Sequence, residues 1–105
     1  MATWGPAPGG NSNDVTTLGV HNLAGNMSEW TADTFAPYSA PCWQPTGTLL
    51  VDPVCQEPAP GAQQSFTARG SAWAGYKFEA LATARRNPGK TTGDPYTGFR
   101  CARSM

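Results

Sequence analysis

Alternating apolar and polar residues, rather than a helical period, mark the first half of the chain. Between residues 20 and 35 the apolar positions do not recur every three or four residues, and the pair Gly25-Asn26 is typical of a turn. Alternation continues from Met27 to Thr31. This segment therefore predicts a turn followed by a strand.

Segments rich in turn-forming residues surround the predicted strand. Residues 1–18 contain mainly Gly, Pro, Asn and Thr, so we expect a lead-in with little regular structure, and a packed part that begins near Gly19. Residues 36–66 hold six of the ten prolines. This composition predicts a long surface loop with one short strand over residues 48–51.

The last third of the chain gives a mixed pattern. Residues 64–73 lead through the Arg69-Gly70-Ser71 sequence into a predicted short strand. Residues 77–86 are rich in Ala and Leu, which favour helix, and the pattern leaves helix and loop both open. Two turn sequences follow, and residues 96–102 predict a final strand with Phe99 and Cys101 on one face.

Length and composition indicate one small, loop-rich domain. A chain of 105 residues is too short for separate cofactor and substrate domains. Hydrophobic residues make up 39% and charged residues 13%, both low, whereas 12 Gly and 10 Pro are many for this length. Four Trp, four Phe and three Tyr remain to anchor a core.

Charge is balanced overall but divided unequally along the chain. Residues 1–68 carry five acidic side chains and no basic one, a charge of −5, and residues 69–105 carry seven basic and two acidic ones, a charge of +5. A net charge of zero argues against a nucleic-acid binder. Either the basic third binds an anion, or the two parts pack together and partly neutralise each other, which we favour.

The three cysteines and the lack of long apolar runs bear on the cellular compartment. Cys42 and Cys55 bracket twelve residues, a spacing that favours a disulfide, although a reducing cytosol would leave two thiols. Cys101 is expected to be a small buried hydrophobe. No run is long enough to span a membrane, and the first residues do not resemble a secretory signal. The compartment stays open, and an extracytoplasmic one requires a signal upstream in a longer protein.

Several stretches, in this order, resemble the formylglycine-generating enzyme family, also called sulfatase-modifying factor domains. They are residues 19–33 (GVHNLAGNMSEWTAD), 69–73 (RGSAW), 84–86 (ARR) and 98–103 (GFRCAR). The resemblance implies an irregular, loop-rich α+β fold of the C-type-lectin-like kind. It also implies that residues 19–105 correspond to the C-terminal part of a larger family domain, so that this fold is truncated here.

The resemblance further implies a structural calcium ion. By residue match its ligands are the Asn22 side chain, the backbone carbonyls of Gly25 and Met27, and the Glu29 carboxylate, all of them hard oxygen donors. From the residues alone, Gly25-Asn26 is an ordinary turn with Asn26 in the left-handed region and Glu29 solvated. The resemblance favours the metal site.

Family chemistry does not transfer to this sequence. Formylglycine-generating oxidases use a pair of cysteines that bind copper(I) a few residues after the Gly-Ser that matches Gly70-Ser71, and Ala74 and Glu79 stand near those places here. Neither side chain offers the sulfur that copper(I) requires, so no copper is expected. His21 gives no catalytic triad and is expected to be structural.

Arginines in the basic third admit two interpretations. Arg85, Arg86 and Arg100 either bind an anionic ligand or tie strands together, and we favour the second.

Three functional hypotheses follow. The first is a non-catalytic, calcium-stabilised domain that binds a protein or small ligand through its loops. The second is a fragment of a formylglycine-generating oxidase, or of a related sulfoxide synthase, whose active site needs other segments. The third is a structural accessory module. For the first hypothesis the contact candidates are four aromatic residues, each of which could equally belong to the core: Trp73, Tyr76, Phe78 and Tyr96. An exposed apolar face would favour self-association.

Overall fold

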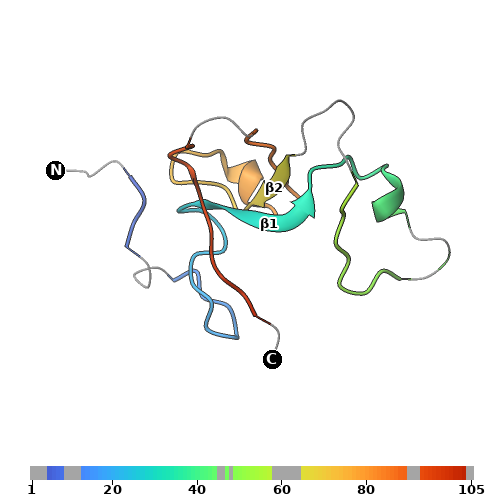
Figure 1. Ribbon diagram of the computed structural model, residues 1–105. Helices are drawn as coiled ribbons and strands as arrows, with labels where there is room; N and C mark the ends of the chain where they lie inside the picture. Colours follow the sequence, from blue (N-terminus) through green and yellow to red (C-terminus); the bar gives the residue numbers. More distant parts are fainter. Residues whose placement is uncertain are drawn as a thin grey trace.

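A small mixed sheet lies at the centre of the computed structural model, which describes residues 5–8, 13–44, 47, 49–57, 65–89 and 93–103. Its strands are β1 (Ser28–Thr34), β2 (Phe66–Arg69) and β3 (Thr97–Gly98), in the order β2-β1-β3. Strand β1 pairs antiparallel with β2 and parallel with β3 (Figure 1). The chain therefore gathers around β1, where its first and last thirds meet.

Strand β1 follows the predicted turn. Gly25 and Asn26 have φ of 98° and 65°, a left-handed conformation that reverses the chain before the strand. Ser28 and Thr34 are buried at the two ends of β1. The pairing with β2 shifts between Trp30 and Thr34, so the strand is bent there. The predicted turn and strand are both present.

Small side chains form the interior of the described chain. The buried apolar residues are four alanines and one cysteine, and the largest fully buried side chains are Thr34, Thr67, Cys55 and Ser28. Large apolar residues are mostly exposed instead. Because so little apolar surface is buried, hydrogen bonds and the disulfide contribute much of what stabilises the loops.

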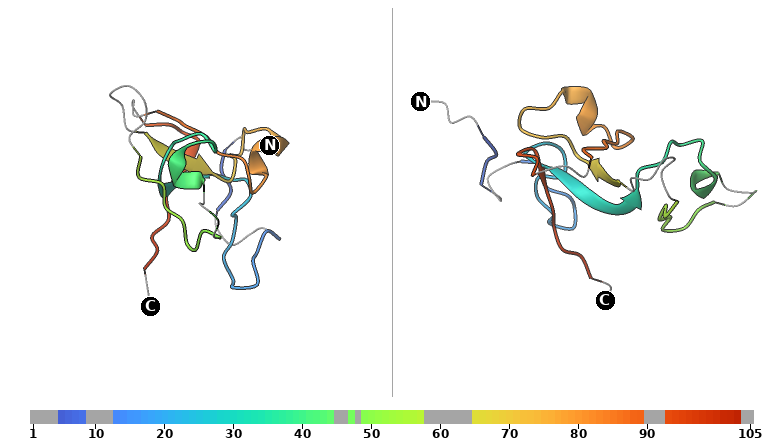
Figure 2. Two further views of the ribbon diagram at one scale, coloured as in Figure 1. Left: turned by 90° about the vertical axis from the view of Figure 1, so that its right-hand side faces the viewer. Right: turned by 45° about the horizontal axis from the view of Figure 1, so that its top comes forward.

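The Cys42–Cys55 disulfide predicted from the sequence is present, with a Cα–Cα distance of 5.3 Å. It ties the 3-10 turn η1 (Pro41–Trp43) to the chain that returns toward the sheet. Cys55 is also attached to β1, since its carbonyl accepts the Thr34 N–H at 2.8 Å and its N–H donates to Asp33 Oδ1 at 3.0 Å. The described residues 36–44, 47 and 49–57 thus form a lobe, the disulfide lobe, beyond the C-terminal end of β1 (Figures 1 and 2).

Arg85 fastens the disulfide lobe to the last third of the chain. Its guanidinium carbon lies 3.6 Å from the ring centroid of Tyr38, 5.5 Å from that of Trp43 and 5.6 Å from that of Phe35. The Tyr38 hydroxyl donates to the carbonyl of Thr83 at 2.8 Å. A cation surrounded by three aromatic faces is a favourable electrostatic contact, so Arg85 ties segments together as predicted.

The lead-in is more ordered near its end than the sequence predicts. Val15 and His21 form an isolated antiparallel bridge around a tight turn, closed by the Gly19 N–H donating to the Thr16 carbonyl at 2.9 Å. Farther upstream, Ala7 exchanges two hydrogen bonds with the Asn26 side chain, at 2.6 and 3.1 Å. Packing therefore begins before Gly19.

Three predicted strands differ from the structure, and residues 77–86, which the pattern left open, take a defined form. Strand β2 ends at Arg69, before the Gly70-Ser71 pair that was expected to lead into the strand. Residues 77–86 supply only the one-turn 3-10 helix η2 (Lys77–Ala80), and no α-helix occurs in the described ranges. Residues 49–51 form no strand, and residue 48 lies outside the described residues. The final strand shrinks to Thr97–Gly98 because only these residues reach β1.

Cys101 was wrongly predicted to be buried. It is exposed, as is Phe99, because no segment of the described chain covers the stretch after β3. The fold class is accordingly loop-rich with a small mixed sheet, and regular helices do not contribute to it in the described ranges. Within the same ranges no helix is long and apolar enough to cross a membrane.

Candidate functional site

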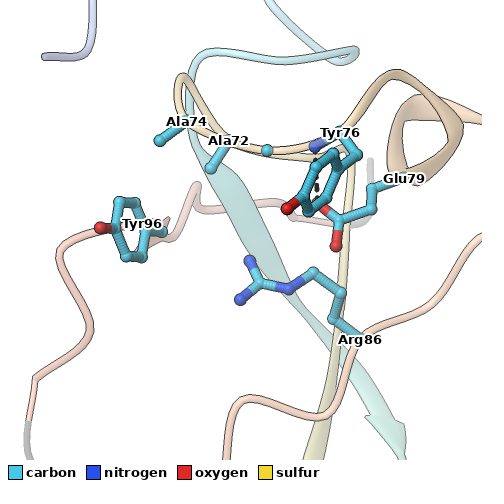
Figure 3. A pocket seen from close by; sticks show the side chains of 7 residues that line it. Ala72, Ala74, Tyr76, Glu79, Arg86 and Tyr96 are labelled. Carbon is cyan, nitrogen blue, oxygen red and sulfur yellow. Dashed lines mark hydrogen bonds between the residues drawn. The ribbon is translucent and has the colours of Figure 1, made fainter. Parts of the chain in front are cut away.

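A pocket of about 230 Å³ opens beside the sheet. Its lining comes from the loop after β2, from η2, from the segment paired with β2, and from the turn before β3 (Figure 3). The lining residues are Ala72, Ala74, Gly75, Tyr76, Glu79, Arg86 and Tyr96. The pocket thus lies where the last third of the chain folds back over β1.

Backbone geometry after β2 builds one wall of the pocket. Gly70 and Ser71 have φ of 96° and 63°, so the chain leaves the sheet abruptly. The Trp73 N–H donates to the Asn26 carbonyl at 2.7 Å and fixes this loop to the turn before β1. At Gly75 an added Cβ would press on Ser71 Oγ and lie 2.7 Å from Glu79 Oε2, so a larger residue here would displace these two side chains.

Glu79 stands at the rim of the pocket, on η2. One carboxylate oxygen accepts the Tyr76 N–H at 3.2 Å, and the Glu79 N–H donates to the Tyr76 carbonyl at 2.9 Å. These two bonds cap the single turn of η2 and hold the carboxylate in place. Glu79 therefore presents a negative charge at a fixed position.

Arg86 supplies a positive charge at the base of the pocket. Its backbone exchanges two hydrogen bonds with Ala68 of β2, at 2.8 and 3.0 Å, and its Nη1 donates to Ser28 Oγ of β1 at 3.0 Å. Its Nη2 lies 3.9 Å from Asp94 Oδ2, a distant ion pair. No ion pair joins Arg86 to Glu79 in the part of the chain that the structure describes.

Asp94 helps to hold the turn that carries Tyr96. Its carboxylate accepts the Thr97 hydroxyl at 2.6 Å and the Tyr96 N–H at 2.9 Å. The Thr97 hydrogen bond above all, with smaller contributions from Tyr96 and Arg86, lowers the pKa of Asp94 although burial opposes this. The carboxylate is thus kept charged beside Arg86.

Two of the four aromatic contact candidates line this pocket, and the other two pack behind them. Tyr76 and Tyr96 line it, and each is backed by a second ring. Tyr76 stacks on Phe78 with centroids 5.5 Å apart, and Tyr96 packs against Trp73 at the same distance. Sequence reasoning omitted Glu79 and Arg86 from the contact set, although the Ala-Arg-Arg stretch had marked Arg86 as a candidate for an anion.

The residues predicted to hold calcium lie in the turn before β1 and in β1 itself. Asn22 is buried with φ of 58°, and the Gly25 N–H donates to the Gly70 carbonyl. The Glu29 side chain is not simply solvated. Its two carboxylate oxygens accept Arg100 Nε, at 2.7 Å, and Arg100 Nη2.

Arg100 places a fixed positive charge next to these oxygens. Its Nη2 also donates to the carbonyl of His21 at 2.9 Å, and the hydrogen bond to Glu29 raises the pKa of Arg100 above its ordinary value. No group of three or more His, Cys, Asp or Glu side chains is placed to hold a metal in the described ranges. A calcium ion here would depend on amide and backbone oxygens and share Glu29 with Arg100.

Comparison with known proteins identifies the family. A search among curated proteins found no match, and neither did a search among solved structures. A sequence model of the sulfatase-modifying factor enzyme 1-like domain matches residues 6–105, nearly the whole chain. The order of the matching stretches predicted this relationship, and the chain therefore belongs to the family of sulfatase-modifying factor enzyme 1-like domains, whose fold is C-type-lectin-like.

Proposed function

We propose that this chain is a non-catalytic member of its family that binds a ligand in the pocket described above. The observation that carries the proposal is a pocket that two aromatic residues, Tyr76 and Tyr96, line together with Arg86 and Glu79, each of the two rings being packed against a second ring outside the lining. Aromatic walls with a few fixed polar groups are typical of ligand-binding pockets.

Pocket composition supports binding rather than oxidation. Ala74 and Glu79, which by resemblance stand near the places of the family's copper-binding cysteines, both line the pocket. Copper(I) requires sulfur ligands, which these side chains do not offer. The disulfide between Cys42 and Cys55 belongs to a separate lobe. A ligand would therefore be held here without the family's redox chemistry.

The lining indicates the kind of ligand. Arg86 suits a carboxylate or another planar anion, because its guanidinium presents several N–H donors. Tyr76 and Tyr96 offer ring faces to a planar or apolar group, and Glu79 favours a cationic one. A small aromatic molecule with a carboxylate meets the first two requirements, and an added amine would meet the third.

Three probes that share a phenyl ring and differ in the charged groups they carry test this proposal. Phenylalanine, phenylacetate and phenethylamine would be titrated into the isotope-labelled protein, with chemical shifts of the pocket residues as the readout. We expect both carboxylate-bearing probes to shift them in a saturable manner, and Tyr76→Ala to weaken that binding about tenfold, as the loss of one aromatic contact implies. Phe99→Ala, an exposed residue outside the pocket, is the matched control. No saturable shifts with any probe would overturn the proposal.

We also propose that calcium stabilises the fold through Asn22, Gly25, Met27 and Glu29. The donor set is all oxygen, which suits a hard cation. A ligand that binds only the folded state raises stability by about 2.7 kcal/mol at a hundred times its dissociation constant. We expect the melting temperature to rise with calcium and fall back with chelator.

Two variants separate this site from general salt effects. Glu29→Gln removes the one charged ligand and should abolish the calcium response, whereas Asp52→Asn removes an exposed carboxylate elsewhere and should preserve it. A melting temperature of the unmodified protein that does not change with calcium would contradict the proposal. Arg100 alone would then neutralise the Glu29 carboxylate.

A further inference from the structure

Few direct ion pairs join the acidic and the basic parts of the described chain. Within the described ranges one ion pair, between Glu29 and Arg100, joins the acidic part to the basic part. The other ion pair, between Arg86 and Asp94, lies within the basic part. Among the described residues, mutual neutralisation by direct ion pairs is therefore limited to Glu29 and Arg100, and charged side chains such as Asp52 and Lys77 are exposed to other molecules.

The acidic part contains an exposed apolar loop. Leu49 and Val51 are 90% and 83% exposed, Val54 is exposed as well, and Asp52 stands between them. The disulfide closes this stretch at Cys55, which is fully buried, so that the loop projects from a fixed base. We call Leu49, Val51, Asp52 and Val54 the acidic loop. Apolar side chains exposed together in this way are typical of an interaction surface.

The basic part carries a second exposed apolar surface. On and next to η2, Phe78 and Leu81 are 61% and 60% exposed, and Lys77 is exposed beside them. The Arg69 guanidinium reaches the same stretch, since its Nη1 donates to the Ala82 carbonyl at 2.7 Å. We call Arg69, Lys77, Phe78 and Leu81 the basic face. Glu79 is the acidic residue nearest to it and is already bonded to the Tyr76 N–H.

The acidic loop and the basic face do not meet within one chain. The disulfide lobe lies beyond the C-terminal end of β1, whereas η2, drawn in orange, lies over the sheet on the other side of β2 (Figure 1). The right-hand view of Figure 2 shows the same separation. Each surface is therefore free to contact another molecule.

We propose that copies of this chain associate head to tail, with the acidic loop of one copy seated on the basic face of the next. The two surfaces are complementary. Both expose apolar side chains, and the acidic loop carries a negative charge whereas the basic face carries positive ones. A contact between two different surfaces repeats from copy to copy and yields a ring or a filament rather than a symmetric dimer. Lys77 and Leu81 lie outside the pocket lining, so this association does not depend on the proposed ligand.

Two variants of the full chain test the proposal by sedimentation velocity over a range of protein concentrations. The loop variant carries Leu49→Ser, Val51→Ser and Asp52→Asn, because asparagine tolerates the positive φ of 43° at that position. The face variant carries Lys77→Glu and Leu81→Ser. We expect the unmodified protein to self-associate, less so at high salt, and each variant alone to associate at least about tenfold more weakly, the effect of losing roughly 1.4 kcal/mol.

Mixing the two variants gives the decisive result. The intact loop of the face variant can still bind the intact face of the loop variant, so an equimolar mixture should form a 1:1 dimer and nothing larger. Leu18→Ser, at an exposed position outside both surfaces, is the matched control and should associate like the unmodified protein. A protein that stays monomeric at every concentration, variants that associate normally, or a mixture without dimer would overturn the proposal.

A cross-linking measurement on the unmodified protein covers the case of a variant that fails to fold. Carbodiimide joins carboxylates to amines in direct contact, so a mixture of light and isotope-labelled protein should yield a peptide pair linking Asp52 of one copy to Lys77 of the other. Cross-links found only within one copy, or only at other residues, would count against the head-to-tail contact.

Discussion

Replacing both Cys42 and Cys55 by alanine is expected to lower the free energy of unfolding by about 3 kcal/mol, the value for closing a loop of this length in the chain-entropy account. The reason is that the disulfide restricts the unfolded chain, and that Cys55 also fills the buried centre of its lobe beside Ala36 and Ala40. The midpoint of urea denaturation measures the loss. Because so few apolar side chains are buried, the free energy of unfolding is small, and this loss is a large fraction of it.

The third cysteine provides the control for this experiment. Cys101→Ser alters an exposed thiol outside the disulfide lobe and should leave the midpoint unchanged. Adding a dithiol reductant to the unmodified protein should reproduce the loss seen in the double variant. An unchanged midpoint in both the double variant and the reduced protein would mean that the hydrogen bonds of Cys55 to Asp33 and Thr34 hold the lobe without the disulfide.

Gly70→Ala is expected to be the most damaging single substitution. Gly70 has φ of 96°, and an added Cβ would lie 2.6 Å from the backbone oxygen of Leu23, which no side-chain movement can relieve. The left-handed conformation costs roughly 1–2 kcal/mol for alanine, and forcing the neighbouring backbone aside adds about 1–3 kcal/mol. The midpoint of urea denaturation should fall accordingly. The displaced backbone would include the turn before β1, to which Leu23 belongs.

Gly19→Ala separates the two causes. Gly19 also has a positive φ, of 78°, but an added Cβ there would meet nothing within 4 Å. It should therefore show only the conformational cost. If Gly70→Ala and Gly19→Ala lose the same stability, the contact between the Gly70 segment and the Leu23 carbonyl is not as close in solution as in this structure.

Local sequence signals predicted the centre of the fold better than its edges. The turn at Gly25-Asn26 and the strand after it depend on backbone preferences and alternation, which act within a few residues. The strand predicted over residues 96–102 failed for a different reason. Its pattern gave Phe99 and Cys101 a common face, but a face is buried only where another segment covers it, and none in the described chain does so.

The site could be predicted only in part for a similar reason. The sequence suggested the four aromatic residues as contact candidates, yet their pairing into one stacked and one tilted pair depends on how η2 and the turn at Asp94 are placed. Neighbouring arginines were indistinguishable in the sequence. Arg85 points into an aromatic cage and Arg86 into the pocket because Arg86 pairs with Ala68 of β2, a partner 18 positions away. The bond of Arg100 to Glu29 spans 71 positions.

Arg86 belongs both to the pocket and to the hydrogen-bonded sheet, whereas Tyr76 belongs to the pocket alone. Arg86 is bonded to two strands and lines the pocket, so any exchange that alters ligand preference there would also unsettle the sheet. Tyr76 is 70% exposed and touches the pocket from the start of a one-turn helix. For the proposed ligand site, this means that the aromatic rim can change at little cost to folding, whereas Arg86, and with it a preference for an anionic group, cannot change without loss of stability.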